Sequence, residues 1–207
     1  MDPVKRLRKP VAPCQVCFLH LTRCICHLIP SLKLRTRIAL VVHTKELKRT
    51  TNTGRLALRA LPNSEMFIRG ETINRDPLLL DSLLTPNYRT LMFYPSDNAR
   101  ELTTELVEES PLPIQLIVPD GSWRQASKVH YRHHELAEVP RVKISAVNPA
   151  TLHMRTENHE AGMATLEAIA CALGIIEGEE VKAELMKFYQ AKLEGTLQGR
   201  GQLGKTL

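Results

Sequence analysis

The chain has 207 residues, of which 43% are apolar, and this is enough for one ordinary globular domain with a core of its own. Its first ten residues are charged and carry no apolar segment of a secretory signal. The longest apolar run, residues 168–176, is far shorter than the roughly 20 residues of a membrane span. We therefore expect a cytoplasmic protein with no membrane partner, in which clustered cysteines bind metal and do not form disulfides.

Positive charge is concentrated in the first part of the chain. Residues 1–60 hold 13 Lys and Arg against two acids, a balance of +11, whereas residues 61–207 hold 15 against 20, a balance of −5. Such asymmetry favours a polyanionic partner such as nucleic acid. A charged, solubilising surface is the alternative, since a basic balance alone is a weak signal.

In chain order we expect a basic arm over residues 1–13, a cysteine-rich knuckle over 14–35, a main domain over 36–195 and a tail over 196–207. Short apolar runs predict strands at 38–42, 66–68, 90–94, 114–118 and 142–145. Apolar periodicity predicts helices at 53–61, 98–109, 122–135, 160–175 and 179–193, the second with Asn98 as its N-cap. This alternation predicts an α/β fold with a mainly parallel sheet flanked by helices.

The knuckle carries four cysteines in the spacing C-x2-C-x6-C-x-C, namely Cys14, Cys17, Cys24 and Cys26. Four thiolates satisfy the tetrahedral preference of zinc, and a site with all four positions filled by protein is structural. An iron–sulfur cluster is the alternative, and His20 or His27 could replace a cysteine. Cys171 lies in an apolar stretch and is expected in the core.

Polar residues follow three of the predicted strands. They are His43, the run Ser96-Asp97-Asn98, and the run Asp120-Gly121-Ser122-Trp123. In parallel sheets, ligands bind at the carboxyl ends of the strands, so these residues form a candidate site. Taken alone, the last run is also compatible with an N-capped helix and a core tryptophan.

Several sequence elements occur together in one order over about residues 14–176. They are the cysteine knuckle, His43-x-x-Glu46, Thr51-Asn52-Thr53-Gly54-Arg55-Leu56, Tyr94-Pro95-Ser96-Asp97, Asp120-Gly121-Ser122-Trp123 and Ala164-Thr165-Leu166-Glu167-Ala168. This ordered set resembles the DTW-domain family, named for an Asp-x-Thr-Trp signature. The family signature has Thr where this chain has Ser122, which keeps the hydroxyl.

The resemblance implies a tRNA-uridine aminocarboxypropyltransferase that uses S-adenosylmethionine, with a SPOUT-like fold. The C-terminal half of SPOUT methyltransferases threads a trefoil knot, a rare feature among folds. The implied reaction moves the 3-amino-3-carboxypropyl group to N3 of a tRNA uridine. A SPOUT-type RNA methyltransferase and a non-catalytic zinc-knuckle RNA-binding protein are the alternatives.

Roles for individual residues follow from the resemblance. Asp120 is expected either to remove the N3 proton as a general base, which needs a raised pKa, or to hold a polar group of S-adenosylmethionine. The residues expected to bind the cofactor are Ser96, Asp97, Ser122, Trp123, Thr165 and Glu167. The residues expected to contact RNA are Arg49, Asn52, Arg55, Arg124 and Arg155, although for each arginine a plain surface role is an equal alternative.

Overall fold

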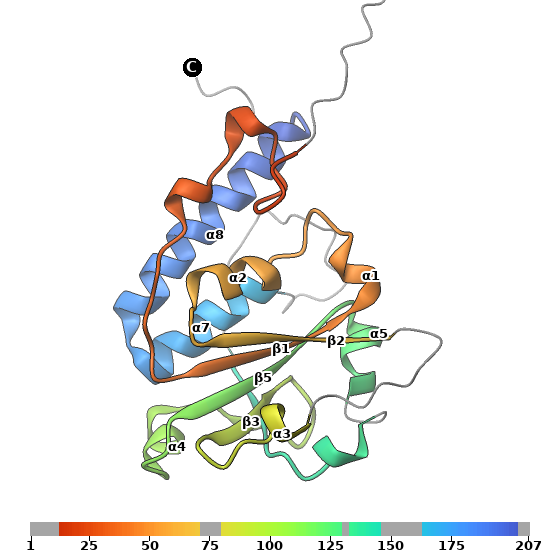
Figure 1. Cartoon of the computed structure of the whole chain (residues 1–207). Coiled ribbons are helices and arrows are strands. Elements are labelled where there is room, and N and C mark those ends of the chain that lie inside the picture. The colour runs from red at the N-terminus through yellow and green to blue at the C-terminus, as the bar shows by residue number, and fades with distance from the viewer. Residues whose placement is uncertain (1–12, 71–79, 130–132, 146–162, 203–207) are drawn as a thin grey trace, which may run out of the picture.

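The computed structural model describes residues 13–70, 80–129, 133–145 and 163–202 (Figure 1). In this part of the chain, six strands form one sheet in the order β2-β1-β5-β3-β6-β4, and every neighbouring pair is parallel. The strands are β1 (Arg37–His43), β2 (Ser64–Arg69), β3 (Arg89–Phe93), β4 (Arg100–Glu101), β5 (Ile114–Asp120) and β6 (Arg141–Lys143). The predicted parallel α/β architecture is confirmed.

Strand β1 is apolar and buried from Ile38 to Val42 because both faces of the sheet are covered there. Side chains alternate between the faces along a strand. Ile38, Leu40 and Val42 belong to one buried cluster, and Ala39 and Val41 belong to another. The continuous apolar run in the sequence is therefore explained by burial on two sides.

The larger cluster lies under three helices on one face of the sheet, α2 (Gly54–Ala60), α7 (Thr165–Glu177) and α8 (Glu179–Gly199) (Figure 1). α7 and α8 pack against each other after a sharp turn at Gly178, whose φ of 115° favours glycine. The remaining short elements are η1 (Leu21–Arg23), η2 (Cys26–Leu28), α1 (Thr44–Leu47), α3 (Leu80–Leu83), α4 (Thr104–Glu108), α5 (Trp123–Ala126) and η3 (His134–Leu136).

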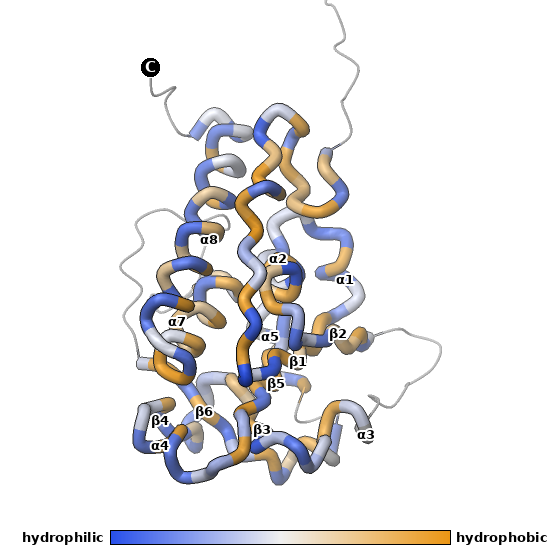
Figure 2. Tube along the Cα trace, turned by 60° about the vertical axis from the view of Figure 1, so that its left-hand side comes forward, coloured by the Kyte–Doolittle hydropathy of each residue, from blue (hydrophilic) through white to orange (hydrophobic). Residues whose placement is uncertain are grey.

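The cysteine knuckle is not a separate body. Cys17 and Leu19 are buried in the same cluster as Leu193 and Leu197 of α8. The segment that joins the knuckle to β1 runs alongside α8 (Figures 1 and 2). α8 itself extends to Gly199, past the boundary expected at residue 195. The knuckle and the last turns of α8 therefore share one core.

The helix predicted over residues 98–109 is shorter than expected. The chain first forms β4 at the sheet edge, and the helix α4 covers only Thr104–Glu108. Asn98 does not cap a helix, because its Oδ1 accepts from Ser96 Oγ at 2.9 Å and from Arg141 Nη1 at 3.0 Å. The cap is Thr103, whose Oγ1 accepts from the backbone N–H of Leu106 at 3.3 Å.

The helix predicted over residues 122–135 is also not continuous, since α5 ends at Ala126 and a 3-10 turn occupies His134–Leu136. The predicted helix over 160–175 begins at Thr165, and residues 160–162 lie outside the described residues. The trefoil knot that the resemblance implies for the C-terminal half stays a prediction, because residues 146–162 are likewise outside them. None of the described helices is long and apolar enough to span a membrane.

Candidate active site and cysteine cluster

The carboxyl ends of β1 and β5 lie next to each other, with Val42 opposite Asp120 in the register. Asp120 ends β5 and is only 5% exposed. Its position at the carboxyl edge of a central parallel strand is the place where such sheets bind ligands. The sequence-based choice of Asp120 therefore falls on a buried acid in a suitable location.

Two side chains from distant parts of the chain hold the Asp120 carboxylate. Asn52 donates from Nδ2 to Oδ2 at 2.5 Å, and Thr165 donates from Oγ1 to Oδ1 at 2.6 Å. Asn52 lies just before α2, and Thr165 is the first residue of α7. The carboxylate thus joins three elements, and hydrogen bonds to a charged group are the stronger kind.

The loop before α2 is fixed by further contacts. The Oδ1 of Asn52 accepts from the backbone N–H of Arg55 at 3.1 Å, which orients the amide with its nitrogen toward Asp120. Thr53 accepts from the backbone N–H of Leu166 at 3.2 Å, a second link to α7. A Cβ at Gly54 would lie 3.0 Å from Asp120 Oδ2, so glycine is required by this close approach.

Most of the residues expected to bind the cofactor lie at or just after the carboxyl ends of the strands, but their contacts differ. Thr165 contacts Asp120 directly. Ser96 and Asp97 follow β3, the neighbour of β5, and Ser122 is exposed, with its N–H donating to Gln125 Oε1 at 2.8 Å. Trp123 begins α5 directly after them in the chain.

Glu167 is buried, and its carboxylate accepts a hydrogen bond from the backbone. Its Oε2 accepts from the backbone N–H of Ala164 at 3.2 Å, which satisfies a donor at the start of α7. This capping pattern, an acid three residues after the N-cap Ala164, was visible in the sequence.

Of the residues expected to contact RNA, Asn52 is only 2% exposed and is engaged with Asp120. Arg49 is exposed and pairs with Glu46 at 3.1 Å, and Arg124 is exposed on α5. Arg55 donates to the carbonyl of Leu47 at 2.6 Å. Arg155 lies outside the described residues.

The guanidinium of Arg55 also lies over the ring of Phe18, 4.8 Å from its centroid. This is within the range of a cation–π contact. Phe18 directly follows Cys17 at the end of the first cysteine turn and adopts a φ of 57°, and its N–H donates to the Cys14 carbonyl at 2.9 Å. Arg55 therefore connects the cysteine turn with the loop that holds Asp120.

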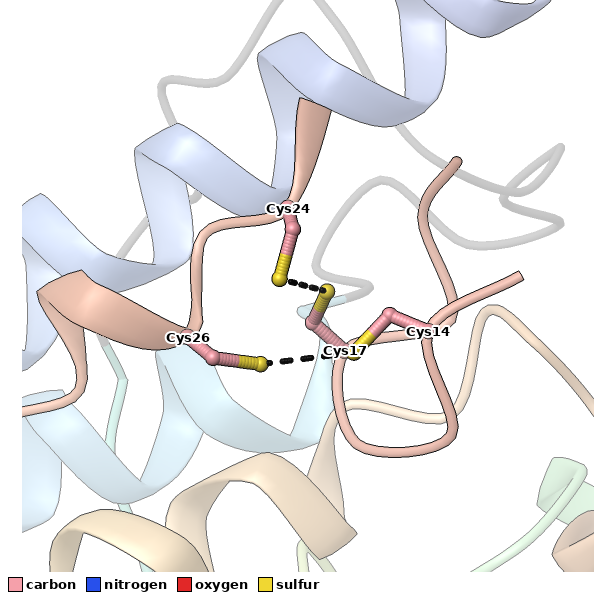
Figure 3. A group of neighbouring side chains, drawn as sticks. All are labelled: Cys14, Cys17, Cys24 and Cys26. Carbon is pink, nitrogen blue, oxygen red and sulfur yellow. Dashed lines mark hydrogen bonds between the residues drawn. The ribbon is translucent and has the colours of Figure 1, made fainter. Parts of the chain in front are cut away.

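The four cysteines of the knuckle converge, as Figure 3 shows, with all sulfur atoms within 4.8 Å of one another. Cys14 and Cys26 are 3.5 Å apart and Cys17 and Cys24 are 3.8 Å apart. In a tetrahedral site with Zn–S bonds of about 2.3 Å, the sulfur atoms lie about 3.8 Å apart. The cluster therefore fits a metal ion with four thiolate ligands.

The thiols differ in their surroundings. Backbone N–H groups of Cys17 and Val16 lower the pKa of Cys14 to about 6. Burial raises the pKa of Cys17 and of Cys26. Because only thiolates bind a metal, Cys14 is prepared for ligation by its turn, whereas Cys17 and Cys26 depend on the charge of the ion.

A buried lysine lies between the cysteine cluster and the loop before α2. Lys192 of α8 is only 1% exposed and donates to the carbonyls of Cys17 at 2.7 Å and Thr50 at 3.1 Å. Burial lowers its pKa to about 8. Lys192 was not among the residues predicted from the sequence, although its spacing from Phe188 and Tyr189 places it on the apolar face of a helix.

Comparison with known proteins identifies the family. A model of the DTW domain matches residues 11–197. The chain belongs to this family. The expectation drawn from the motifs is confirmed.

Relatives in the DTW family include proteins named tRNA-uridine aminocarboxypropyltransferase 2. The one from Macaca fascicularis is 25% identical over 98% of this chain and 68% of its own length, and the one from Drosophila melanogaster is 28% identical over 90% and 74%. tRNA-uridine aminocarboxypropyltransferase A of Arabidopsis thaliana is 25% identical over 79% and 72%. A solved structure, the SAM-dependent rRNA:acp-transferase Tsr3 from Vulcanisaeta distributa, covers 79% of each chain with 18% identity and a TM-score of 0.47.

Proposed function

We propose that this DTW protein transfers the 3-amino-3-carboxypropyl group of S-adenosylmethionine to N3 of a tRNA uridine. The family match over most of the chain supports the proposal, together with relatives that carry this activity in their names. The single structural observation that carries it is the buried Asp120 carboxylate, held by Asn52 and Thr165 at the carboxyl end of β5.

The reaction exchanges one bond for another. N3 passes its proton to solvent water and forms a bond to the terminal methylene carbon of the amino-acid arm. The bond from that carbon to sulfur breaks with its electron pair going to sulfur, which leaves neutral methylthioadenosine. Because three carbons on the sulfonium could be attacked, the protein must align the correct carbon with N3, and such alignment can lower a barrier by several kcal/mol.

For Asp120 we propose the anchoring role. Each of its oxygens already accepts a hydrogen bond from a neighbouring element, and this stabilises the carboxylate form over the protonated form that a general base must reach. A carboxylate accepts up to about four hydrogen bonds, so it can also hold an ammonium or hydroxyl group of the donor. Ser96, Asp97, Ser122 and Trp123 are proposed to complete the cofactor site from the neighbouring strand ends.

The metal of the cysteine cluster is proposed to be a structural Zn2+, held by Cys14, Cys17, Cys24 and Cys26. All four positions of a tetrahedral ion are then filled by protein, so the ion is not a part of the chemistry. We further propose that the fold is SPOUT-like and that the protein acts on tRNA in the cytoplasm.

The direct test incubates the protein with bulk tRNA and S-adenosylmethionine, followed by digestion to nucleosides and mass spectrometry. We expect an aminocarboxypropyl adduct on uridine and release of methylthioadenosine. A methyl adduct would identify a SPOUT-type methyltransferase instead. Binding of tRNA without cofactor binding or product would identify a non-catalytic RNA-binding protein.

Removal of residues 2–9 is expected to weaken tRNA binding and flatten its dependence on salt. The deletion takes away Lys5, Arg6, Arg8 and Lys9, and each phosphate contact that is lost reduces counterion release on binding. Affinity for S-adenosylmethionine is expected to stay unchanged. The logarithm of the tRNA affinity is plotted against the logarithm of salt concentration, and an equal slope for both proteins would show that this arm does not contact RNA.

A further inference from the structure

A pocket of about 190 Å³ lies between the knuckle and the last turns of α8. Its lining includes Phe18, His20 and Arg23 from the knuckle, Thr50 from the loop before α2, and Lys192 and Thr196 from α8. Pockets that enclose a drug-sized ligand start at about 300 Å³. This pocket is therefore too small for S-adenosylmethionine and suits a smaller group.

Two glycines on α8 allow the knuckle to pack this closely. A Cβ at Gly195 would lie 2.7 Å from the side chain of Leu19, and a Cβ at Gly199 would lie 3.4 Å from the guanidinium of Arg23. Both glycines line the pocket, one helical turn apart. The two glycines therefore allow the knuckle to lie close to one face of α8, and the pocket is formed where the two segments meet.

Among the described residues, the charged side chains that line the pocket are cationic. Arg23 and Lys192 are cations, His20 contributes a further imidazole, and no acidic residue is among the side chains that line it. Lys192 uses two of the three donors of its ammonium on the carbonyls of Cys17 and Thr50. Its charge is buried beside the pocket, where electrostatic interactions are stronger than in water.

We propose that this pocket binds one backbone phosphate of the RNA substrate. The inference rests on the proposed function, because it takes the polyanion to be the tRNA that is modified. The pocket suits a single phosphate group because it is small and lined by cations. Arg23 is one of them, and arginine binds phosphate through paired hydrogen bonds.

The pocket is linked to the candidate active site through the loop before α2. Thr50 lines the pocket and accepts from Lys192, and two residues later Asn52 holds Asp120. Phe18 also lines the pocket, and the guanidinium of Arg55 lies over its ring. The backbone N–H of Arg55 in turn donates to Oδ1 of Asn52. A phosphate in the pocket would therefore fix the RNA relative to the same loop that positions the Asp120 carboxylate.

The test compares Arg23→Gln with Arg35→Gln, which removes the same charge at the opposite, amino-terminal end of β1. Both arginines are exposed, so neither change should unfold the protein. For Arg23→Gln we expect about tenfold weaker tRNA binding and a salt slope smaller by about one, as for the loss of one phosphate contact. Arg35→Gln should leave both quantities unchanged.

A second pair of variants changes the pocket from the α8 side. Thr196→Glu places a carboxylate in the pocket and is expected to weaken tRNA binding more than Arg23→Gln does, whereas Thr196→Gln has a similar size without the charge and should bind nearly as well as wild type. Equal losses for Arg23→Gln and Arg35→Gln, or for the two Thr196 variants, would overturn the proposal.

Titration with inorganic phosphate separates RNA from a free phosphate as the source of the group. If Arg23→Gln abolishes phosphate binding and leaves tRNA affinity unchanged, the pocket serves a free anion and the proposal is wrong. The activity assay stays independent of this result. At saturating tRNA the Arg23→Gln protein should still form product, whereas absence of product with the wild-type protein would refute the proposed function and not the pocket.

Discussion

Replacement of both Cys14 and Cys24 with serine is expected to abolish zinc binding, from about one ion per chain to none. Only two thiolates then remain of the four that converge in the knuckle. The binding energy of a structural zinc ion is on the order of 10 kcal/mol in isolated zinc fingers, and it becomes folding energy. Loss of the zinc ion should therefore destabilise every element that packs on the cysteine cluster.

The structure predicts where this loss extends. Leu19 and Ile25 share a buried cluster with Leu193 and Leu197, so the last turns of α8 should open together with the knuckle. The strands at the centre of the sheet, packed on both faces, should remain protected. Hydrogen exchange and limited proteolysis measure this difference along the chain.

Cys171→Ser provides the control, because this cysteine lies on α7 outside the cluster. It should leave the zinc content at about one. A full complement of zinc in the Cys14→Ser/Cys24→Ser protein would show that these cysteines are not the ligands. Loss of zinc with an unchanged α8 would show that the knuckle does not stabilise the helix.

The middle of the sheet could be predicted because β1, β3 and β5 contain short runs of mostly apolar residues that are buried on both faces. The first half of the helix expected at 98–109 is not helical, for a local reason that the sequence did not reveal. Asn98 is a good cap by residue type, but its side chain accepts from Arg141, a residue distant in sequence. Arg100 and Glu101 form the edge strand β4 and not the first turn of a helix, because they pair with β6 through backbone hydrogen bonds.

Asp120 could be located from the sequence because the rule about strand ends needs only a strand and the residue after it. Its partners could not be located in the same way. Asn52 is 68 residues away and Thr165 is 45 away, and only the strand order brings them together. Lys192 is 175 residues from Cys17, so its contact also depends on the packing of α8.

Replacement of Asp120 with asparagine is expected to weaken S-adenosylmethionine binding by about 10- to 150-fold. This corresponds to the loss of one hydrogen bond to a charged group, about 1.5–3 kcal/mol. The melting temperature should stay close to that of the wild type. The new amide oxygen can still accept from Asn52, and the new amide nitrogen can donate to the hydroxyl of Thr165, which is able to accept. Calorimetric titration of the cofactor and thermal unfolding measure the two effects.

The same variant tests the rival role of Asp120 as a general base. A lost base lowers the chemical step by about 10²–10⁴-fold at unchanged cofactor affinity, and a higher pH should restore part of the rate because hydroxide can ionise N3. The anchoring role predicts weaker cofactor binding and little recovery with pH in single-turnover experiments.

Asp120→Ala separates both roles from a purely structural one. It removes both acceptor oxygens and leaves the buried Nδ2 of Asn52 without its present acceptor, at a cost of about 1–3 kcal/mol in unfolding free energy. A stable Asp120→Asn protein beside a destabilised Asp120→Ala protein would show that the hydrogen bonds hold the fold and that the charge serves the ligand. Wild-type cofactor affinity and rate in Asp120→Asn would remove this carboxylate from the mechanism, because the variant removes the negative charge and one acceptor oxygen at nearly constant shape.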